Sequence, residues 1–192
     1  MIWARIEPFE RHAEAYDRWY DEHVDLYRAE LEALGRLLPP GRALEVGVGT
    51  GRFAAPLGIR WGVEPSRTMA RMAKGRGVEV VRAVAERLPL RDGCLDVILM
   101  MTTLCFLDDP LRALREARRV LRSGGYVVMG FVDREGPLGA RARRRAADSP
   151  FWAVATLRSA SEVLELLRQA GFQRLELRSV PKAGLTVARG VR

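Results

Sequence analysis

The sequence has very few cysteines, and it lacks a long apolar run. Its 192 residues include only Cys94 and Cys105, which do not form the close pair typical of a zinc or redox motif, so we expect both to be reduced and buried. No apolar stretch reaches the length of about 18 residues that a membrane span requires, and no signal-peptide pattern opens the chain. These absences argue against a disulfide-stabilised or membrane-spanning protein and predict a cytoplasmic location.

Lysine is nearly absent, and asparagine is entirely absent. Lysine occurs only at Lys74 and Lys182, so arginine supplies almost all of the positive charge behind the formal net charge of +8. Clustered positive charge attracts nucleic acid, but here the arginines are scattered along the whole chain. A GC-rich genome or a thermostable protein would explain this composition equally well, so charge alone does not identify a partner.

What the chain does contain is an alternation of short apolar runs with amphipathic stretches, which predicts a single α/β unit. Apolar residues spaced three and four apart predict a helix from about Pro8 to Leu38, broken near Asp21 and ended by the Pro-Pro-Gly at 39–41. We expect residues 1–40 to form a helical lid and residues 41–192 to form the main domain.

The main domain is predicted to be a Rossmann-like, doubly wound sheet of seven mostly parallel strands that ends in an antiparallel hairpin. The hairpin is expected because residues 181–184 are too few for a parallel crossover. Residues 52–55 look helical, and residues 133–149 read as a polar stretch. The predicted strands are 43–46, 59–64, 78–81, 95–101, 126–132, 172–180 and 185–188, and the predicted helices are 66–74, capped by Ser66, 110–121 and 161–170.

A glycine-rich turn, Gly47-Val48-Gly49-Thr50-Gly51, directly follows the first strand. Glycines there allow a ligand to approach the backbone, and a following helix would offer free N–H groups. A P-loop is ruled out because the segment has no lysine. A dinucleotide fingerprint is disfavoured because Arg52 stands where its third glycine belongs. A turn made only for packing is the remaining alternative.

A second candidate is Glu64, at the end of the second strand. In a doubly wound sheet this carboxylate lies beside the glycine turn, where it can accept hydrogen bonds from both hydroxyls of a ribose. An acidic residue at a strand end is common, and it is the pairing with the glycine turn that gives Glu64 a functional interpretation. The two features together predict an adenosyl-type ligand.

The ordered set of motifs resembles the class I S-adenosylmethionine-dependent methyltransferases, and most closely the small bacterial ubiquinone/menaquinone-methyltransferase-like group (methyltransferase type 11). The resemblance covers roughly residues 40–175 and lies in the segments 44–53, 62–66, 85–90, 95–97 and 124–126. It implies that the cofactor is held by Glu45, Gly47, Val48, Gly49 and Gly51 at the methionine end, by Glu64 at the ribose, and by Pro65, Ala85 and Glu86 around the adenine. Val84 departs from the family, in which many members have an acidic residue that bonds the adenine amino group.

The resemblance implies methyl transfer, and we expect the acceptor to be a small molecule. The sulfonium of S-adenosylmethionine is already reactive, so the protein chiefly needs to align the acceptor and exclude water. No His-Asp or Cys-His pair suggests a catalytic base, and no metal is expected. Two alternatives stay open: methylation of RNA or protein through the Arg141–Arg145 region, and cofactor binding without catalysis. A nicotinamide-dependent dehydrogenase is a further competitor.

The acceptor is expected over the carboxyl ends of the strands, between the loop after the fourth strand and the N-terminal helix. Tyr16-Asp17-Arg18-Trp19-Tyr20 looks like the lid sequence of similar methyltransferases, although aromatic residues at helical spacing often serve packing alone. His12 and His23 fall on nearly the same helical face, and for this pair we expect surface positions rather than a metal site, while His23 also stays a candidate to face the acceptor. The residues predicted to face the acceptor are Tyr16, Trp19, His23, Thr102 and Thr103, with Tyr20, Cys105 and Phe106 beside them.

Overall fold

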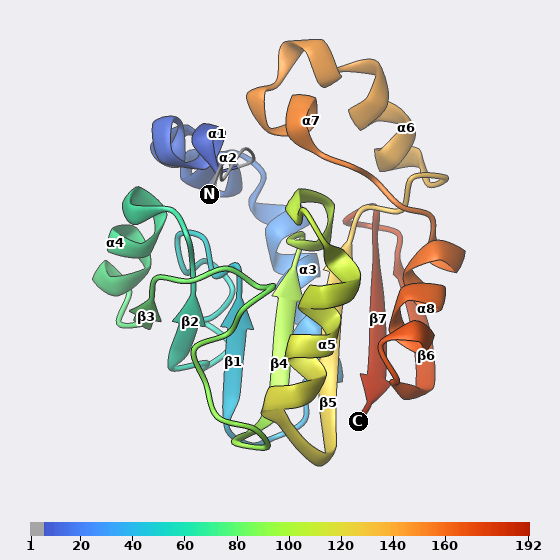
Figure 1. The fold of residues 1–192 in the computed structure, drawn as a ribbon. Coiled ribbons are helices and arrows are strands. Elements are labelled where there is room, and N and C mark those ends of the chain that lie inside the picture. Colours follow the sequence, from blue (N-terminus) through green and yellow to red (C-terminus); the bar gives the residue numbers. More distant parts are fainter. Residues whose placement is uncertain (1–5) are drawn as a thin grey trace.

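The computed structural model describes residues 6–192, which form one seven-stranded sheet flanked by helices (Figure 1). The strand order is β3-β2-β1-β4-β5-β7-β6, and all neighbouring strands are parallel except β7, which runs antiparallel to both β5 and β6. This confirms the predicted doubly wound sheet with its C-terminal hairpin. The strands are β1 (Ala43–Val46), β2 (Trp61–Val63), β3 (Glu79–Val81), β4 (Leu95–Met101), β5 (Leu121–Phe131), β6 (Gln173–Val180) and β7 (Leu185–Val191).

The helices cover both faces of the sheet and also the carboxyl ends of its parallel strands. Figure 1 shows α1 and α2 above the carboxyl ends of β1 and β2. The helices α6 and α7 lie above the same end of the sheet, on the side of β5 and β7. The helices are α1 (Glu7–Arg11), α2 (Ala13–Glu22), α3 (Val24–Leu37), α4 (Arg67–Gly75), α5 (Pro110–Val120), α6 (Pro137–Arg144), α7 (Pro150–Val154) and α8 (Ala160–Gln169), with short 3-10 turns η1 (Leu104–Phe106) and η2 (Ala146–Asp148). No helix of residues 6–192 is long and apolar enough to span a membrane.

The N-terminal helical segment is broken twice rather than once. His12 and His23 both leave helical geometry, with φ/ψ of −119°/26° and −124°/46°, so α1, α2 and α3 change direction at these residues. The break expected near Asp21 therefore lies two residues later. The prediction missed the break at His12 because the apolar spacing continues across it.

Residues 52–58 form a series of turns, so the helix expected after the glycine turn is a wrong prediction. The physical reason is Pro56, which has no N–H to donate to the carbonyl of Arg52 four residues earlier. That carbonyl accepts a hydrogen bond from the hydroxyl of Tyr27 in α3 instead. Gly58 then takes a φ of +69°, which turns the chain toward β2.

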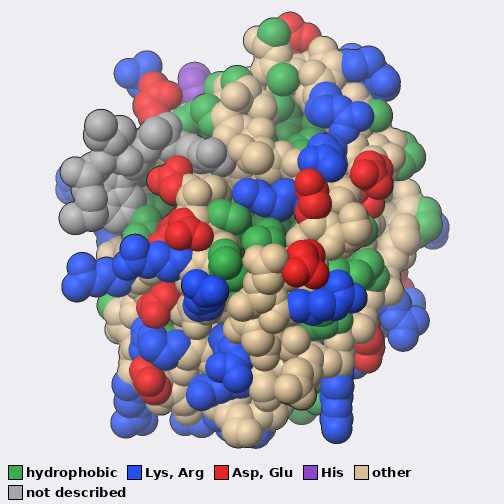
Figure 2. All heavy atoms as spheres, turned by 45° about the vertical axis from the view of Figure 1, so that its right-hand side comes forward, with side chains coloured by type: hydrophobic (Ala, Val, Ile, Leu, Met, Phe, Trp, Pro, Cys, Tyr) green, Lys and Arg blue, Asp and Glu red, His purple; other side chains and the backbone are tan. Residues whose placement is uncertain are grey.

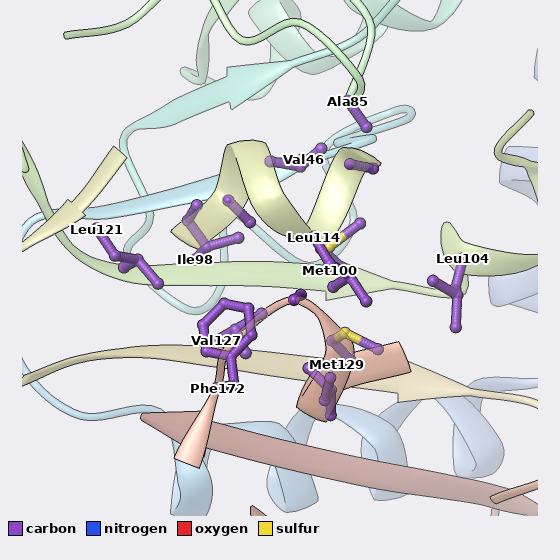
Figure 3. Close-up of a cluster of buried hydrophobic side chains, with 14 of the residues drawn as sticks. Val46, Ala85, Ile98, Met100, Leu104, Leu114, Leu121, Val127, Met129 and Phe172 are labelled. Carbon is purple, nitrogen blue, oxygen red and sulfur yellow. The ribbon is translucent and has the colours of Figure 1, made fainter. Parts of the chain in front are cut away.

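The core has two layers because β4 is buried on both faces, as its continuous apolar run indicates. On one face Ile98 and Met100 pack with side chains of α5 and α8, the cluster that Figure 3 shows. On the other face Val97 and Leu99 pack with Tyr20 of α2 and with α3. Alternate residues of one strand therefore serve opposite layers, and the N-terminal helices share a core with the sheet.

Two smaller predictions need correction. Residues 133–149, expected only as a polar stretch, contain α6 and η2, and α7 follows them. The helices α6 and α7 both start with a proline in the first helical turn, a position where the missing N–H costs no hydrogen bond. Neither cysteine is in a disulfide, and Cys105 is buried, but Cys94 is partly exposed.

Candidate active site

An open cavity lies at the carboxyl ends of β1, β2 and β4. This is the place where the strand order reverses between β1 and β4, at which open α/β sheets bind their ligands. The lining of the cavity comes from the ends of the strands and from the segments above them: Ile6, Phe9, Tyr16, Gly47, Gly49, Val63, Glu64, Pro65, Met69, Ala83, Val84, Ala85, Glu86, Met101, Thr102, Thr103, Phe106, Leu107 and Asp108.

Glu64 joins the glycine turn to the end of β2. Its Oε2 accepts a hydrogen bond from the Gly49 N–H at 2.9 Å, and its Oε1 accepts one from the Ser66 N–H at 2.8 Å. Burial raises the pKa of Glu64 to about 7, and the two backbone hydrogen bonds act in the opposite direction. The turn after the first strand and the carboxylate after the second therefore meet, as the pairing of the two motifs predicts.

The glycine turn presents bare backbone to the cavity. A Cβ on Gly47 would lie 2.6 Å from Thr103 Cγ2, too close for any side chain. Gly49 has a φ of +54°, and a Cβ there would have only the ring of Tyr16 nearby, at 4.0 Å. Both residues line the cavity, so backbone atoms of the turn are accessible to a ligand.

Six of the nine residues predicted to hold a cofactor line this cavity: Gly47, Gly49, Glu64, Pro65, Ala85 and Glu86. The other three support the turn from behind. A Cβ on Gly51 would lie 3.0 Å from Ala73 Cα, so this glycine allows α4 to approach closely, and the side chain of Val48 covers Gly62 of β2. Glu45 is 1% exposed.

The carboxyl group of Glu45 lies under the glycine turn. Burial raises its pKa well above the ordinary value, even though the Ala54 N–H donates a hydrogen bond to it. Its Oε2 has no hydrogen-bond partner among the described residues. Burial therefore favours the neutral form of Glu45, which is not part of the cavity lining.

Of the residues predicted to face the acceptor, Tyr16, Thr102, Thr103 and Phe106 line the cavity. Trp19 and His23 do not; their rings stack on each other with centroids 4.3 Å apart, and the side chain of Trp19 is 38% exposed. Trp19 of α2 and His23, the residue that ends this helix, therefore lie outside the cavity lining. Tyr20 and Cys105 are buried next to the cavity lining.

Tyr16 is held by hydrogen bonds on both sides of its hydroxyl. The Oη atoms of Tyr16 and Tyr20 are 2.9 Å apart, and Thr102 is a second partner. Thr102 takes a φ of +49°, unusual for a β-branched residue, at the end of β4. Burial raises the pKa of Tyr16 to about 12, so its hydroxyl is un-ionised at neutral pH.

A charged cluster that the sequence did not reveal fixes α2 over the glycine turn. Asp17 is 8% exposed; it accepts hydrogen bonds from Arg52 Nε at 2.9 Å and from Arg76 Nη2 at 2.7 Å. Arg76 also donates to the carbonyl of Thr50. Burial alone would raise the pKa of Asp17, but these arginines outweigh it and lower the pKa to about 2.

The predicted lid included the first helix, but its residues Phe9 and Glu10 were not predicted as part of the site. Phe9 lines the cavity, and Glu10 accepts hydrogen bonds from Ser66 Oγ at 2.6 Å and Thr68 Oγ1 at 3.0 Å. Glu10 therefore anchors α1 to the start of α4. The only sequence signal was the expected helix itself, since nothing in its spacing distinguishes a residue above the cavity from one on the surface.

The arginines at 141–145 do not line the cavity. Arg143 donates to the carbonyl of Arg134, and Arg141, Arg144 and Arg145 are exposed. Figure 2 shows acidic side chains interspersed among the Lys and Arg side chains of the face in view. Among residues 6–192 no group of three or more His, Cys, Asp or Glu side chains has an arrangement that could hold a metal ion.

Comparison with known proteins places this geometry among methyltransferases. The profile of the methyltransferase domain family matches residues 44–129. The crystal structure of an S-adenosylmethionine-dependent methyltransferase from Thermotoga maritima, described as a possible histamine N-methyltransferase, superposes with a TM-score of 0.92. It is 42% identical to this chain, and the alignment covers 97% of this chain and 99% of that one.

Two uncharacterized proteins are similarly close in sequence. One, from Methanocaldococcus jannaschii, is 43% identical over 168 residues, which cover 88% of this chain and 82% of that protein. Another, from Mycobacterium tuberculosis, is 41% identical over 168 residues, which cover 85% of this chain. The chain matches only 59% of the length of that mycobacterial protein.

Proposed function

The chain belongs to the family of S-adenosylmethionine-dependent methyltransferases, and from this premise we propose that it transfers a methyl group in line to a small-molecule acceptor bound in the cavity at the carboxyl ends of β1, β2 and β4. The observation that carries the proposal is the junction of Gly49 and Glu64 at a cavity that the chain's own helices cover. Binding sites for small molecules are typically concave and largely preformed in this way.

The residues of the cavity fit the cofactor. Gly47 and Gly49 carry no side chains where a methionine moiety would lie, and only the ring of Tyr16 approaches Gly49. Two backbone N–H groups fix Glu64, which is placed to bind a ribose. Pro65, Ala85 and Glu86 form the adjoining wall, at which an adenine would lie. When bound, S-adenosylmethionine supplies a methyl group that its sulfonium already activates.

The contribution of the protein to the reaction is then binding, orientation and exclusion of water. Tyr16, Thr102 and Phe106 lie at the same cavity as the glycine turn, so they are placed to orient an acceptor. With a pKa of about 12, Tyr16 offers a neutral hydroxyl, which can form hydrogen bonds but does not serve as a base near pH 7. A proton released by the acceptor passes to solvent.

A small molecule is favoured over RNA or protein because α1 and α2 cover the cavity. Glu10 and Asp17 anchor these helices to α4 and to the glycine turn, and a macromolecule would have to displace both contacts to reach the methyl group. The description of the Thermotoga relative as a possible histamine N-methyltransferase also names a small acceptor.

The test uses purified protein and methyl-labelled S-adenosylmethionine. We expect calorimetry to show one cofactor site per chain, and we expect the label to enter low-molecular-weight compounds of a cell extract. Gly49→Val is the control, because a branched side chain at a φ of +54° closes the turn to the cofactor. Label found only in RNA or protein, or wild-type binding in the control variant, would contradict the proposal.

A further inference from the structure

Helix α1 connects the start of α4 to η1 above the cavity. On one side Glu10 accepts hydrogen bonds from Ser66 Oγ at 2.6 Å, from Thr68 Oγ1 at 3.0 Å and from the Thr68 N–H at 3.3 Å. On the other side the ring of Phe9 packs edge-to-face on that of Phe106, with the centroids 4.7 Å apart. Because Phe9 lines the cavity, the hydrogen bonds of Glu10 help to place one of its walls.

Ser66 connects Glu10 to the site residue Glu64. Its hydroxyl donates to Glu10, and its N–H donates to Glu64 Oε1 at 2.8 Å. Ser66 is completely buried, and its Oγ also caps α4 by accepting a hydrogen bond from the Met69 N–H. Two carboxylates from different elements therefore bind one buried serine at the N-terminus of α4, where the helix dipole stabilises negative charge.

The two carboxylates also act on each other electrostatically. The hydrogen bond from Ser66 holds the pKa of Glu10 below its ordinary value, although burial acts in the opposite direction, so Glu10 is ionised near pH 7. Burial is the main reason that the pKa of Glu64 rises to about 7, and the negative charge of Glu10 adds to it. Arg82, which follows β3, lowers the pKa of Glu64, and Glu45 of β1 lies within electrostatic reach of it.

We propose that Glu10 is a positioning residue of the cofactor site, which acts through Ser66 to place the carboxylate of Glu64 and to set the pH range in which Glu64 binds a ribose. This inference rests on the proposed function and adds to the site a residue outside the cavity lining. An ionised Glu64 only accepts hydrogen bonds, as two ribose hydroxyls require, whereas a protonated one carries a donor. The charge of Glu10 moves the change between these forms to higher pH.

A purely structural role for Glu10 predicts a different result. Glu10 would then only hold α1 in place, and its loss would weaken cofactor binding by the same factor at every pH. A charge that acts on Glu64 instead moves the pH midpoint of binding, whatever happens to the affinity at high pH. The midpoint therefore distinguishes the two roles.

The test measures the affinity for S-adenosylhomocysteine by calorimetry between about pH 5.5 and 8.5, the interval around the raised pKa of Glu64. This probe lacks the sulfonium charge, which Glu10 would attract directly. We expect the wild-type affinity to reach half of its high-pH plateau near pH 7. Glu10→Gln keeps the shape of the side chain without its charge, and its midpoint should lie at least about 0.5 pH unit lower. An unchanged or higher midpoint would overturn the proposal.

Three further variants assign the shift. Glu7→Gln is the matched control in α1, because it removes the same charge from an exposed pair with Arg11, and it should leave the midpoint in place. Thr68→Val removes one hydrogen bond to Glu10 but keeps both carboxylates, so it should not lower the midpoint. Glu64→Gln should flatten the pH dependence itself. If Glu7→Gln or Thr68→Val lowers the midpoint as much as Glu10→Gln, or if the dependence persists in Glu64→Gln, the role of Glu10 is refuted.

The two proposals can fail separately. Binding of S-adenosylhomocysteine to the folded wild type is measured first, and its absence would overturn the proposed function itself. Binding with a midpoint that does not respond to Glu10→Gln would overturn only the role of Glu10. Circular dichroism shows whether each variant is folded, and the midpoint is read from each variant's own plateau, so a general loss of affinity does not obscure it.

Discussion

Glu64 is a single residue with two tasks, because the carboxylate that would bind a ribose also fastens Gly49 and Ser66. Replacing it with Gln leaves one acceptor oxygen and turns an amide N–H₂ toward a backbone donor. We expect Glu64→Gln to weaken S-adenosylmethionine binding by about 1.5–3 kcal/mol, the typical loss for hydrogen bonds to a charged group. Calorimetry measures the affinity, and thermal unfolding should show a lower Tm for the same variant.

The control for Glu64→Gln is Glu165→Gln, an exposed position on α8 whose carboxylate bonds only neighbours in its own helix.

Glu64 also predicts a pH dependence of binding. Its pKa of about 7, raised by burial, means that the accepting carboxylate form increases as pH rises from 6 to 8. Cofactor affinity should rise over that interval more steeply in the wild type than in Glu64→Gln, and parallel profiles would contradict the assignment.

Glu30 of α3 predicts a pH dependence of stability. It is 6% exposed, its Oε2 has no partner among the described residues, and burial raises its pKa to about 8. Between its unfolded pKa of 4.5 and its folded pKa of about 8 the folded chain binds more protons, so stability falls as pH rises through this window. Glu30→Gln should remove this loss, gaining on the order of 2–4 kcal/mol relative to wild type between pH 5 and pH 8.5.

Urea unfolding at several pH values measures the Glu30 effect. Glu45 has a raised pKa for the same reason, but it is present in both proteins, so the difference between them isolates Glu30. A constant difference in the free energy of unfolding from pH 5 to pH 8.5 would show that Glu30 is ionised in the folded protein. That result would place solvent or a partner at Oε2 of Glu30, which has no hydrogen-bond partner among the described residues.

At the scale of elements, α2 is fixed to the glycine turn through Arg52. This side chain is 14% exposed, and it bonds both Asp17 and Asp21 of α2 while its backbone continues the turn from Gly51. Arg52→Met would leave the buried Asp17 with Arg76 as its main charged partner. We expect a loss of about 1–3 kcal/mol in unfolding free energy and faster hydrogen exchange in α2.

The matched control for Arg52→Met is Arg36→Met, which removes an exposed ion pair with Glu32 in α3. Exposed pairs of this kind contribute little, so stability and exchange in α2 should not change. If the two variants behave alike, the cluster around Asp17 does not hold α2, and Tyr16 is positioned by its ring contacts alone.

How far an element could be predicted depended on whether its signal was local. The strands followed from continuous or alternating apolar residues, and α4 and α5 from the capping Ser66 and from Pro110 at the first helical turn. The turns at 52–58 were misread because helix-forming residues outweighed the single missing donor at Pro56. The helix α7 escaped notice because it is only five residues long.

At the scale of the whole molecule, the site residues also differ in whether a local sequence signal made them predictable. Gly49 and Glu64 were predictable because a fixed motif and a strand end place each of them at the switch point of the sheet. Tyr16 and Phe106 were also predicted, from the expected lid and from the loop after β4, but Phe9 was not, because its place at the cavity depends on how α1 closes over the sheet. No sequence period connects residues that only tertiary packing brings together.

Packing also determines how the whole chain should unfold. Tyr20 of α2 and Leu34 of α3 belong to the same core cluster as Leu99 of β4 and Val187 of β7, so the N-terminal helices and the sheet have no separate cores. We therefore expect one cooperative transition. Single-tryptophan variants that retain only Trp19, in α2, or only Trp61, in β2, should report the same urea midpoint by fluorescence. An earlier midpoint at Trp19 would instead show that the helices over the cavity detach while the sheet stays folded, and cofactor binding would then have to be coupled to their closure.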